Sequence, residues 1–531
     1  MSTSRHAKGM ECKGNLINRR RRSERDRRLR NRQRRIQYRL RDRVWSPQDA
    51  PMLGARNIHY ALADKVRGLG SGGIGAMHLL ARGTGLIEAI DGRLHLLKVH
   101  LPYHESDHVL NIAYNLLAGG TCLEDMELRR QDEVYLDALG AQRIPDPTTA
   151  GDFCRRFEAS DIQGLMNAVN TVRVKVWRDQ PASFFEEAVI EADGLMVPTT
   201  GECKEGMDLS YQGAWGYHPL LASLANTAEP LFVANRSGNR PSHEGAAWYL
   251  DRAARLCREG GFQKILLRGD TDFTQTAHLD RWDAAGTRFV FGIDAMPNLV
   301  EIAESLPKTA WRRLDRPARY EVKTQPRERP ENVKEQIVRR REFQNIRLHS
   351  EAAAQFDYRP TLCEKAYRVV VVRKNLSVEK GECVLFDDVR YFFYLTNDRE
   401  RSASDVVFCA NDRCDQENLI AQLKGGVRAL QAPVDDLNSN WAYMVMASLA
   451  WTLKAWFALS LPEHGRWSAK HKTEKRRVLR MEFKTFLNAF LRVPCQIIRA
   501  GRRIVYRLLA WNPWQHVFLR GVNALRCPIR C

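Results

Sequence analysis

Hydrophobic residues recur at helical spacing in the first third of the chain. Across residues 106–140 they fall every three or four positions, which predicts helices within a mainly helical DNA-binding region over residues 44–185. A further helix is expected after residue 147, where Thr148 or Thr149 can cap it. A helix-turn-helix that reads DNA has this arrangement, but an ordinary helical hairpin has it too, and both interpretations stay open. Two arginines on the second helix are candidate DNA contacts: Arg155 and Arg156.

Short apolar runs separated by turn residues replace the helical pattern after residue 186. They predict strands at residues 188–192, 219–224, 231–234, 264–268 and 288–293, with helices at 245–257 and 275–284 before the last two strands. Three strands, helix, strand, helix, strand is the element order of a ribonuclease-H-like sheet. We therefore expect an α/β fold with a ribonuclease-H-like catalytic core whose first part spans residues 186–295, although other α/β folds share this order.

A charged, strand-rich stretch interrupts this core. Residues 296–398 predict an inserted, mainly β subdomain with strands at 367–372, 383–386 and 391–396. A helix over residues 412–423 then returns to the core, which ends at residue 464. The longest apolar stretch, residues 441–461, carries Ser448, Thr452 and Lys454 near its middle. These polar groups favour a helix buried in protein over one that crosses a bilayer.

Positive charge is concentrated at the two ends of the chain. The formal net charge is +20, but residues 1–43 hold 17 Lys and Arg against 4 Asp and Glu, residues 465–508 hold 13 against 2, and residues 44–464 are net acidic. Basic flanks indicate a polyanionic partner, and nucleic acid fits because each neutralised phosphate releases counterions. We expect a basic disordered arm over residues 1–43 and a basic helical region over 465–531. A solvated tail without a partner, or a wrongly chosen start codon, would give the same arm.

The cysteine content and the N-terminal sequence indicate the cellular location of the protein. The chain has 12 Cys but no CxxC pair, so we expect reduced, packing cysteines rather than disulfides or a zinc knuckle. The first 18 residues lack the apolar block of a secretory signal. The expected location is therefore the cytoplasm, without a membrane anchor.

Two aspartates end strands that a ribonuclease-H-like sheet places side by side. Asp193 follows the first strand and Asp270 the fourth, so both carboxylates would meet at one end of the sheet. Glu417 lies on the helix after the insertion, where Arg413, Glu417 and Lys424 share one face at i, i+4 and i+11. Three carboxylates can hold two divalent cations, Mg²⁺ or Mn²⁺ in its place, which activate a nucleophile for phosphodiester cleavage. Arg413 and Lys424 would contact the phosphates or hold Glu417.

Each of these signals also has an ordinary explanation. Asp-Gly at a strand end is usually a turn, and an Arg, Glu, Lys face is usually a solvated helix with ion pairs. Glu191 lies two residues before Asp193, and Asp272 lies two residues after Asp270, so both acids compete for the ligand roles. Trp311 in the insertion could stack on an unpaired base of DNA, although a packed core tryptophan is the commoner case.

Five segments in a fixed order resemble the transposases of the insertion sequence 1380 family. They are residues 190–194 (IEADG), 216–220 (GYHPL), 236–239 (RSGN), 267–273 (LRGDTDF) and the spacing Arg413-x3-Glu417-x6-Lys424. The resemblance covers roughly residues 106–508 and implies a DDE transposase with a β-rich insertion before the final glutamate. Carried over, three positions match the catalytic acids: Asp193, Asp270 and Glu417.

Two positions depart from the pattern of that family. Ala410 stands where relatives usually have Tyr, and Asp272 stands where they tend to have Gly, which bears on the ligand set more than on the reaction class. We interpret the Tyr217-His218 pair as structural or DNA-facing, because metal-activated hydrolysis needs no histidine base.

The resemblance also implies what the enzyme acts on. A bacterial, nucleoid-associated homodimer would bind the terminal inverted repeats of its element, cleave strands with metal-activated water and join the 3′ ends to target DNA. A nuclease of the same fold without strand transfer and an inactive DNA-binding derivative are the rival interpretations.

Overall fold

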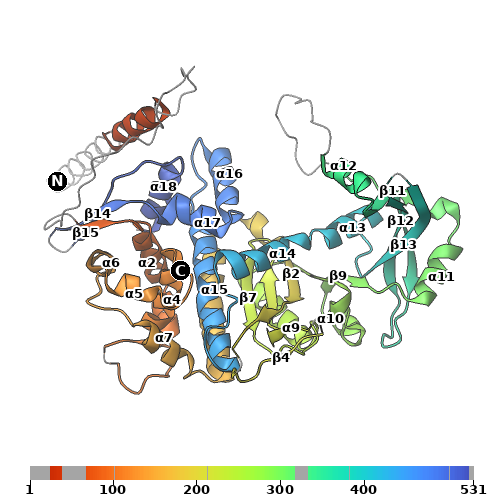
Figure 1. Ribbon diagram of the computed structural model, residues 1–531, viewed down its shortest axis with the longest axis horizontal. Helices are drawn as coiled ribbons and strands as arrows, with labels where there is room; N and C mark the ends of the chain where they lie inside the picture. Colours follow the sequence, from red (N-terminus) through yellow and green to blue (C-terminus); the bar gives the residue numbers. More distant parts are fainter. Residues whose placement is uncertain are drawn as a thin grey trace, which may run out of the picture.

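A nine-stranded mixed sheet runs through the molecule in the order β10-β11-β12-β13-β9-β8-β2-β6-β7. The computed structural model describes residues 24–38, 67–100, 102–201, 203–211, 213–316, 333–381, 383–500 and 503–525. In Figure 1 the N-terminal and C-terminal elements lie together at one side of the molecule, and β11, β12 and β13 project at the other. The strands from β9 to β7 therefore lie between the N-terminal and C-terminal elements on one side and the insertion on the other.

Five of these strands lie between residues 186 and 295, where the apolar runs predict them. They are β2 (Glu187–Gly194), β6 (Leu220–Leu224), β7 (Glu229–Ala234), β8 (Lys264–Gly269) and β9 (Thr287–Ile293). β2 is parallel to β8 and β8 to β9, whereas β6 pairs antiparallel with both β2 and β7. β8 reads as a continuous apolar run because its central residues are buried on both faces. The carboxyl ends of β2 and β8 consequently lie next to each other.

Long helices pack against this part of the sheet. α9 (Ala246–Gly260) contacts β2, β6, β7 and β8, and it ends at Gly261, whose φ of 107° favours glycine. α15 (Leu437–Leu459) contacts β7 and also α4 (Glu105–Leu117) and α8 (Ala159–Arg178). By length and composition α15 could cross a membrane, but its apolar window is 100% buried inside the protein. The structure therefore has α15 as a core helix, in agreement with the polar residues in the middle of its sequence.

The insertion extends the central sheet instead of forming a sheet of its own. β11 (Gln344–Tyr358), β12 (Tyr367–Lys380) and β13 (Cys383–Thr396) are antiparallel neighbours, and β13 pairs with β9 from Phe393 opposite Ile293 to Thr396 opposite Val290. The two separate strands predicted at 383–386 and 391–396 are one strand, because the charged residues between them continue the ladder with β12. α11 (Pro297–Ser305), the short β10 (Arg312–Arg313) and α12 (Val333–Arg340) complete this region.

The N-terminal region consists of several short helices. After α2 (Ile74–Gly83) and α3 (Leu86–Asp91) come α4 (Glu105–Leu117), α5 (Met126–Arg130), α6 (Glu133–Leu139) and α7 (Pro147–Cys154). The cap of α7 is Asp146, not Thr148 or Thr149 as predicted, because the Asp146 side chain accepts a hydrogen bond from the Thr149 backbone and Pro147 occupies the first helical position. Arg155 lies just past the end of this helix rather than on its face, and so does Arg156.

The C-terminal region is not wholly helical, contrary to the prediction. β14 (Cys495–Ala500) and β15 (Arg503–Leu508) form a hairpin that pairs with the two-residue strand β1 (Gly68–Leu69), so the N-terminal and C-terminal regions share a small sheet. β-branched residues such as Ile497 and Val505 explain the strands. The described residues of this region also form the helices α16 (Ser468–Leu479), α17 (Phe483–Phe486) and α18 (Gln515–Leu525).

The described part of the basic arm also differs from the expectation. Residues 24–38 are helical, where the sequence suggested a disordered segment, and Arg28 forms an i, i+4 ion pair with Glu24. Arg32 donates a 3.0 Å hydrogen bond to the carbonyl of Leu508 at the end of β15. This contact brings the arm beside the basic C-terminal region.

Candidate active site

The first two predicted acids lie at the same edge of the sheet. Asp193 is the last residue but one of β2, and Asp270 directly follows β8, its parallel neighbour. Gly194 has a packing role beyond a turn, because a Cβ there would lie 2.7 Å from the His218 ring and 2.9 Å from the Ser242 backbone. The glycine thus allows a loop to approach the end of the strand that carries Asp193.

One arginine joins the three predicted acids. Arg413 precedes α14 (Cys414–Ala421), which carries Glu417 in its first turn. Its Nη1 lies 2.9 Å from Asp270 Oδ2 and 3.6 Å from Asp193 Oδ2, and its Nη2 lies 3.5 Å from Glu417 Oε1. Three elements that are far apart in sequence therefore place three carboxylates around a single guanidinium.

The electrostatics of this cluster favour a further cation. Burial raises the pKa of Asp193 to about 7; Arg413 opposes the rise, and the charges of Asp270 and Glu417 add to it. Burial also raises the pKa of Asp270, again against the pull of Arg413. When all three acids are ionised, Arg413 balances only one of their charges. Carboxylate oxygens from three elements are a donor set that suits hard divalent cations, so the residues present fit such ions.

A cavity of about 490 Å³ opens beside these groups. Asp270, Arg413 and Glu417 line it, together with residues 391–394 of β13 in the insertion. Asp294 also lines the cavity, directly after the end of β9. Sequence reasoning missed Asp294, although it ends its strand just as Asp193 and Asp270 end theirs.

The two competing acids behave differently from the predicted ones. Glu191 is 1% exposed, and its Oε1 lies 2.6 Å from Nη2 of Arg268 on the neighbouring strand. Arg268 also donates to the carbonyl of Cys409, so this pair ties β2 and β8 to the end of α13 (Ala403–Asn411). Asp272 is exposed, and its backbone amide donates a 3.1 Å hydrogen bond to Asp270 Oδ1. The geometry therefore gives Glu191 a structural partner and makes the Asp272 amide a support for Asp270.

Lys424 does not meet Glu417, where the shared helical face suggested that it could. The helix widens into a π-helical turn, η5 (Gln422–Gly426), and Lys424 donates a 2.8 Å hydrogen bond to the carbonyl of Met196. Met196 belongs to the segment that follows Asp193. Lys424 thus fastens the end of this helix to the loop beside the first acid.

The Tyr217-His218 pair is part of a buried loop support. The Tyr217 hydroxyl donates to the carbonyl of Glu205, and Arg236 donates to the carbonyls of His218, Pro241, Ser242 and Glu244. Burial and the nearby Arg236 lower the pKa of His218 to about 4, which keeps the imidazole neutral at pH 7. These contacts agree with the structural interpretation of the pair.

The remaining predicted DNA contacts lie outside the carboxylate cluster. Arg155 forms 2.8 Å ion pairs with Asp152 and Asp435, and Arg156 is exposed beside it. Trp311 is half-buried, and the guanidinium of Arg373 lies 4.4 Å from its ring centre. Tyr391, a wall residue of the cavity, lies 6.3 Å from Trp311 between ring centres. Trp311 therefore packs behind that wall.

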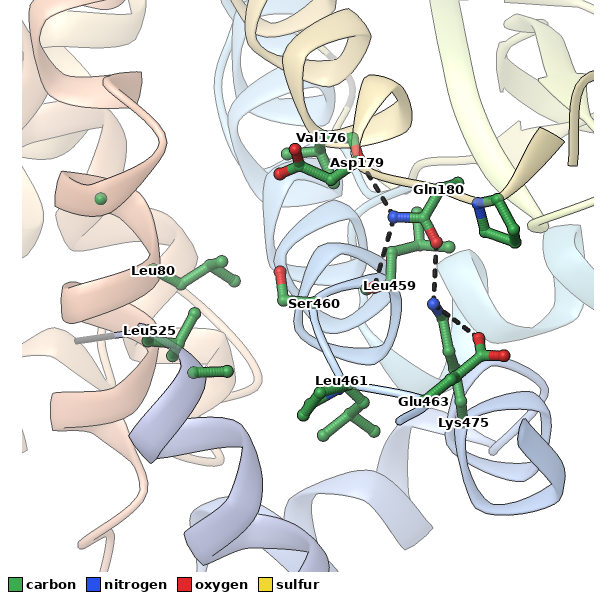
Figure 2. A pocket seen from close by; sticks show the side chains of 14 residues that line it. Leu80, Val176, Asp179, Gln180, Leu459, Ser460, Leu461, Glu463, Lys475 and Leu525 are labelled. Carbon is green, nitrogen blue, oxygen red and sulfur yellow. Dashed lines mark hydrogen bonds and ion pairs between the residues drawn. The ribbon is translucent and has the colours of Figure 1, made fainter. Parts of the chain in front are cut away.

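A second cavity, of about 600 Å³, is lined by residues of several helices (Figure 2). Leu80 of α2, Leu459 of α15 and Leu525 of α18 line it, and Lys475 bridges Gln180 and Glu463 at one side. Its lining among the described residues contains none of the three predicted acids. The cavity beside Arg413, in contrast, is lined by two of them, Asp270 and Glu417.

Comparison with known proteins identifies the family. The model of the transposase DDE domain, group 1, matches residues 69–528. The chain belongs to this family. Among solved structures, the piggyBac transposase synaptic complex with hairpin DNA is similar over 80% of this chain and 82% of that chain, at 9% identity and a TM-score of 0.36. No curated protein sequence matches.

Membership of the family establishes the general activity. Transposases act on DNA, and DDE transposases generally use divalent metal ions, so the chain is a nuclease and transferase of the transposase type. The prediction of a DDE transposase from the ordered segments is confirmed at this level.

Proposed function

We propose that the chain is a cut-and-paste transposase of the insertion sequence 1380 family with a ribonuclease-H-like catalytic core. The observation that carries the proposal is that Asp193, Asp270 and Glu417 surround Arg413. They come from three elements that are far apart in the sequence. The strand order β9-β8-β2-β6-β7, with β2 parallel to β8, supports the ribonuclease-H-like assignment.

The three acids would hold two divalent ions, Mg²⁺ in the usual case. When bound, the ions supply an activated water and stabilise the leaving oxygen in phosphodiester cleavage. Asp193 and Asp270 are positioned by the ends of β2 and β8, and Glu417 approaches from α14. Arg413 keeps the carboxylates together, and its planar donor group is suited to a phosphate oxygen. Lys424 holds the loop after Asp193, as a positioning residue.

The two departures from the family pattern fall beside this site. Ala410 lines the cavity next to Arg413, where a tyrosine would fill part of the space. Asp272 supports Asp270 through its backbone amide, a contact that any residue can make. Both departures are therefore compatible with the proposed ligand set.

The DNA partner would be the pair of terminal inverted repeats, bound by a homodimer in the bacterial cytoplasm. The helices of residues 44–185 would read the repeats, and the basic ends would supply contacts to phosphates. The bond between Arg32 and the Leu508 carbonyl supports a common basic surface for the two ends.

Deleting residues 1–43 should weaken binding to all DNA about equally and flatten its dependence on salt. Loss of preference for the repeats with unchanged affinity for random DNA would contradict this role.

The decisive test uses a labelled duplex that carries the inverted repeat. The protein should nick it only with Mg²⁺ or Mn²⁺, and pre-cut ends should be joined to a target plasmid. Nicking without joining would indicate the nuclease instead of the transposase. Repeat binding without nicking, in both metals, would indicate an inactive DNA-binding derivative.

A further inference from the structure

Two histidines and a glutamate meet at the start of α4, in the N-terminal region. The ligand atoms of His100, His104 and Glu105 all lie within 4.8 Å of one another. His100 Nε2 is 3.0 Å from Glu105 Oε2, and the His104 ring stacks on the His100 ring with 4.3 Å between centres. The DDE chemistry uses none of these groups, which lie at or just before the N-terminus of α4, outside the central sheet.

Backbone hydrogen bonds fix the carboxylate of the glutamate in this cluster. Glu105 is 1% exposed, and its Oε1 accepts hydrogen bonds from the backbone amides of Leu96 at 3.0 Å and Leu97 at 3.1 Å. Oε2 is thereby turned toward the two imidazoles.

The charge around the cluster also suits a cation. A helix begins at Glu105, and the partial positive charge of its N-terminus disfavours a bound cation. Two further carboxylates lie at the same helix end and oppose that effect: Asp107 accepts from the His104 backbone, and Asp91 accepts from the backbone and the hydroxyl of Ser106.

The donor set distinguishes this cluster from the carboxylate site. Two imidazole nitrogens and one carboxylate oxygen are ligands that Zn²⁺ accepts, whereas Mg²⁺ prefers oxygen ligands throughout. Both histidines are exposed, so solvent can reach the cluster and a water can fill a fourth position. One buried ligand, Glu105, and two exposed histidines match a site with three protein ligands and a fourth position open to solvent.

We infer that His100, His104 and Glu105 bind one transition-metal cation, of which Zn²⁺ is the best fit. The ion would fasten the segment before residue 101 to the N-terminus of α4. This inference is independent of the proposed catalytic function, because no residue is shared between the two sites.

The test uses the full chain with Asp193→Asn and Asp270→Asn, so that the carboxylate site does not take up the metal. Zn²⁺ is titrated in competition with a chromophoric chelator, and Co²⁺ binding is followed by its visible absorption. We expect one equivalent of tight binding and the intense absorption of a four-coordinate Co²⁺. His100→Gln and His104→Gln should each weaken binding by at least about tenfold.

The matched control is His95→Gln, because His95 is an exposed histidine of the same segment and lies outside the cluster. It should bind Zn²⁺ as tightly as the parent. Equal melting temperatures of all variants in EDTA would establish that the histidine substitutions leave the fold intact. Binding that survives His104→Gln, or a parent without stoichiometric binding, would overturn the inference.

Discussion

Two acids on one strand, Glu191 and Asp193, meet arginine in opposite ways. Glu191 lies 2.6 Å from Arg268, and the side chains are only 1% and 6% exposed. Asp193 lies 3.6 Å from Arg413, which also contacts Asp270 and Glu417. The first contact balances one negative charge with one positive charge. The second sets three acids against a single arginine beside an open cavity.

The difference separates a structural ion pair from a candidate metal site. Burial raises the pKa of both acids to about 7, because loss of water disfavours the ionised carboxylate. The difference lies in the partners. Arg268, fixed between two strands and a carbonyl, pairs with Glu191, whereas Asp193 shares Arg413 with Asp270 and Glu417. Carboxylates whose negative charge is only partly balanced, and which lie at a cavity, are suited to bind divalent ions.

The largest expected effect is on cleavage. Asp193→Asn, Asp270→Asn and Glu417→Gln each remove a ligand charge with little change in shape, so nicking of the inverted-repeat duplex should fall by roughly 10³-fold or more while repeat binding survives. Because the three acids act together, a double substitution should cost little more than a single one. Mn²⁺ should restore part of the activity of a weakened site, since it binds such ligands more tightly than Mg²⁺.

The control for this prediction is Asp272→Asn, which changes an exposed acid two residues from Asp270 and leaves its backbone amide in place. Its nicking rate should stay close to that of the parent. Full activity in any one of the three ligand variants would remove that residue from the ligand set, and full activity in all three would refute the metal site.

The next effect is on stability, and it should separate the two arginines. Arg268→Ala leaves the buried Glu191 without its partner and should lower the free energy of unfolding by about 3 to 5 kcal/mol. Arg413→Ala should lower it by less, because the Arg413 side chain is 22% exposed and its partner Glu417 is 60% exposed, yet it should reduce nicking strongly. Urea unfolding and the nicking assay are the two measurements. A large loss of stability in Arg413→Ala would make Arg413 a structural residue and remove the contrast between the two clusters.

The sequence alone predicted the elements that carry the site. Strand runs such as 264–268 are strongly apolar because the strands are buried on both faces, so their pattern is clear without a structure. Asp193 and Asp270 could be paired because parallel neighbours end at one edge of the sheet. The ordered segments then identified a DDE transposase, which the family match confirms.

The rest depended on contacts that no local pattern contains. The π-helical turn before Gly426 directs Lys424 to Met196, and a count of i, i+4 and i+11 assumes an uninterrupted α-helix. The partner of Glu191 is Arg268, which is 77 residues away and adjacent only across the parallel ladder. The hairpin of β14 and β15 was missed for a similar reason, since β14 also pairs with β1, which lies more than 400 residues earlier in the sequence.

The smallest expected effect is a pH dependence of stability without divalent metal. The ordinary pKa of an aspartate is about 3.9, whereas burial raises that of Asp193 to about 7 in the folded protein. The folded state therefore keeps a proton that the unfolded state has lost, and stability falls as the pH rises between these two values, then stays low above pH 7.

Asp193→Asn should lack the part of the pH dependence that comes from residue 193, because an amide does not titrate in that range. In EDTA the parent should lose about 1 to 3 kcal/mol more stability than the variant between pH 5 and pH 8, with the other acids of the cluster sharing the effect. Mg²⁺ at pH 8 should stabilise the parent and leave the variant nearly unchanged, since the ion replaces the proton as the compensating charge. Glu191 is unaltered in both proteins, so its own titration cancels in the difference. Identical pH profiles in EDTA would mean that Arg413 alone balances Asp193, and the charge excess that distinguishes the two clusters would not exist.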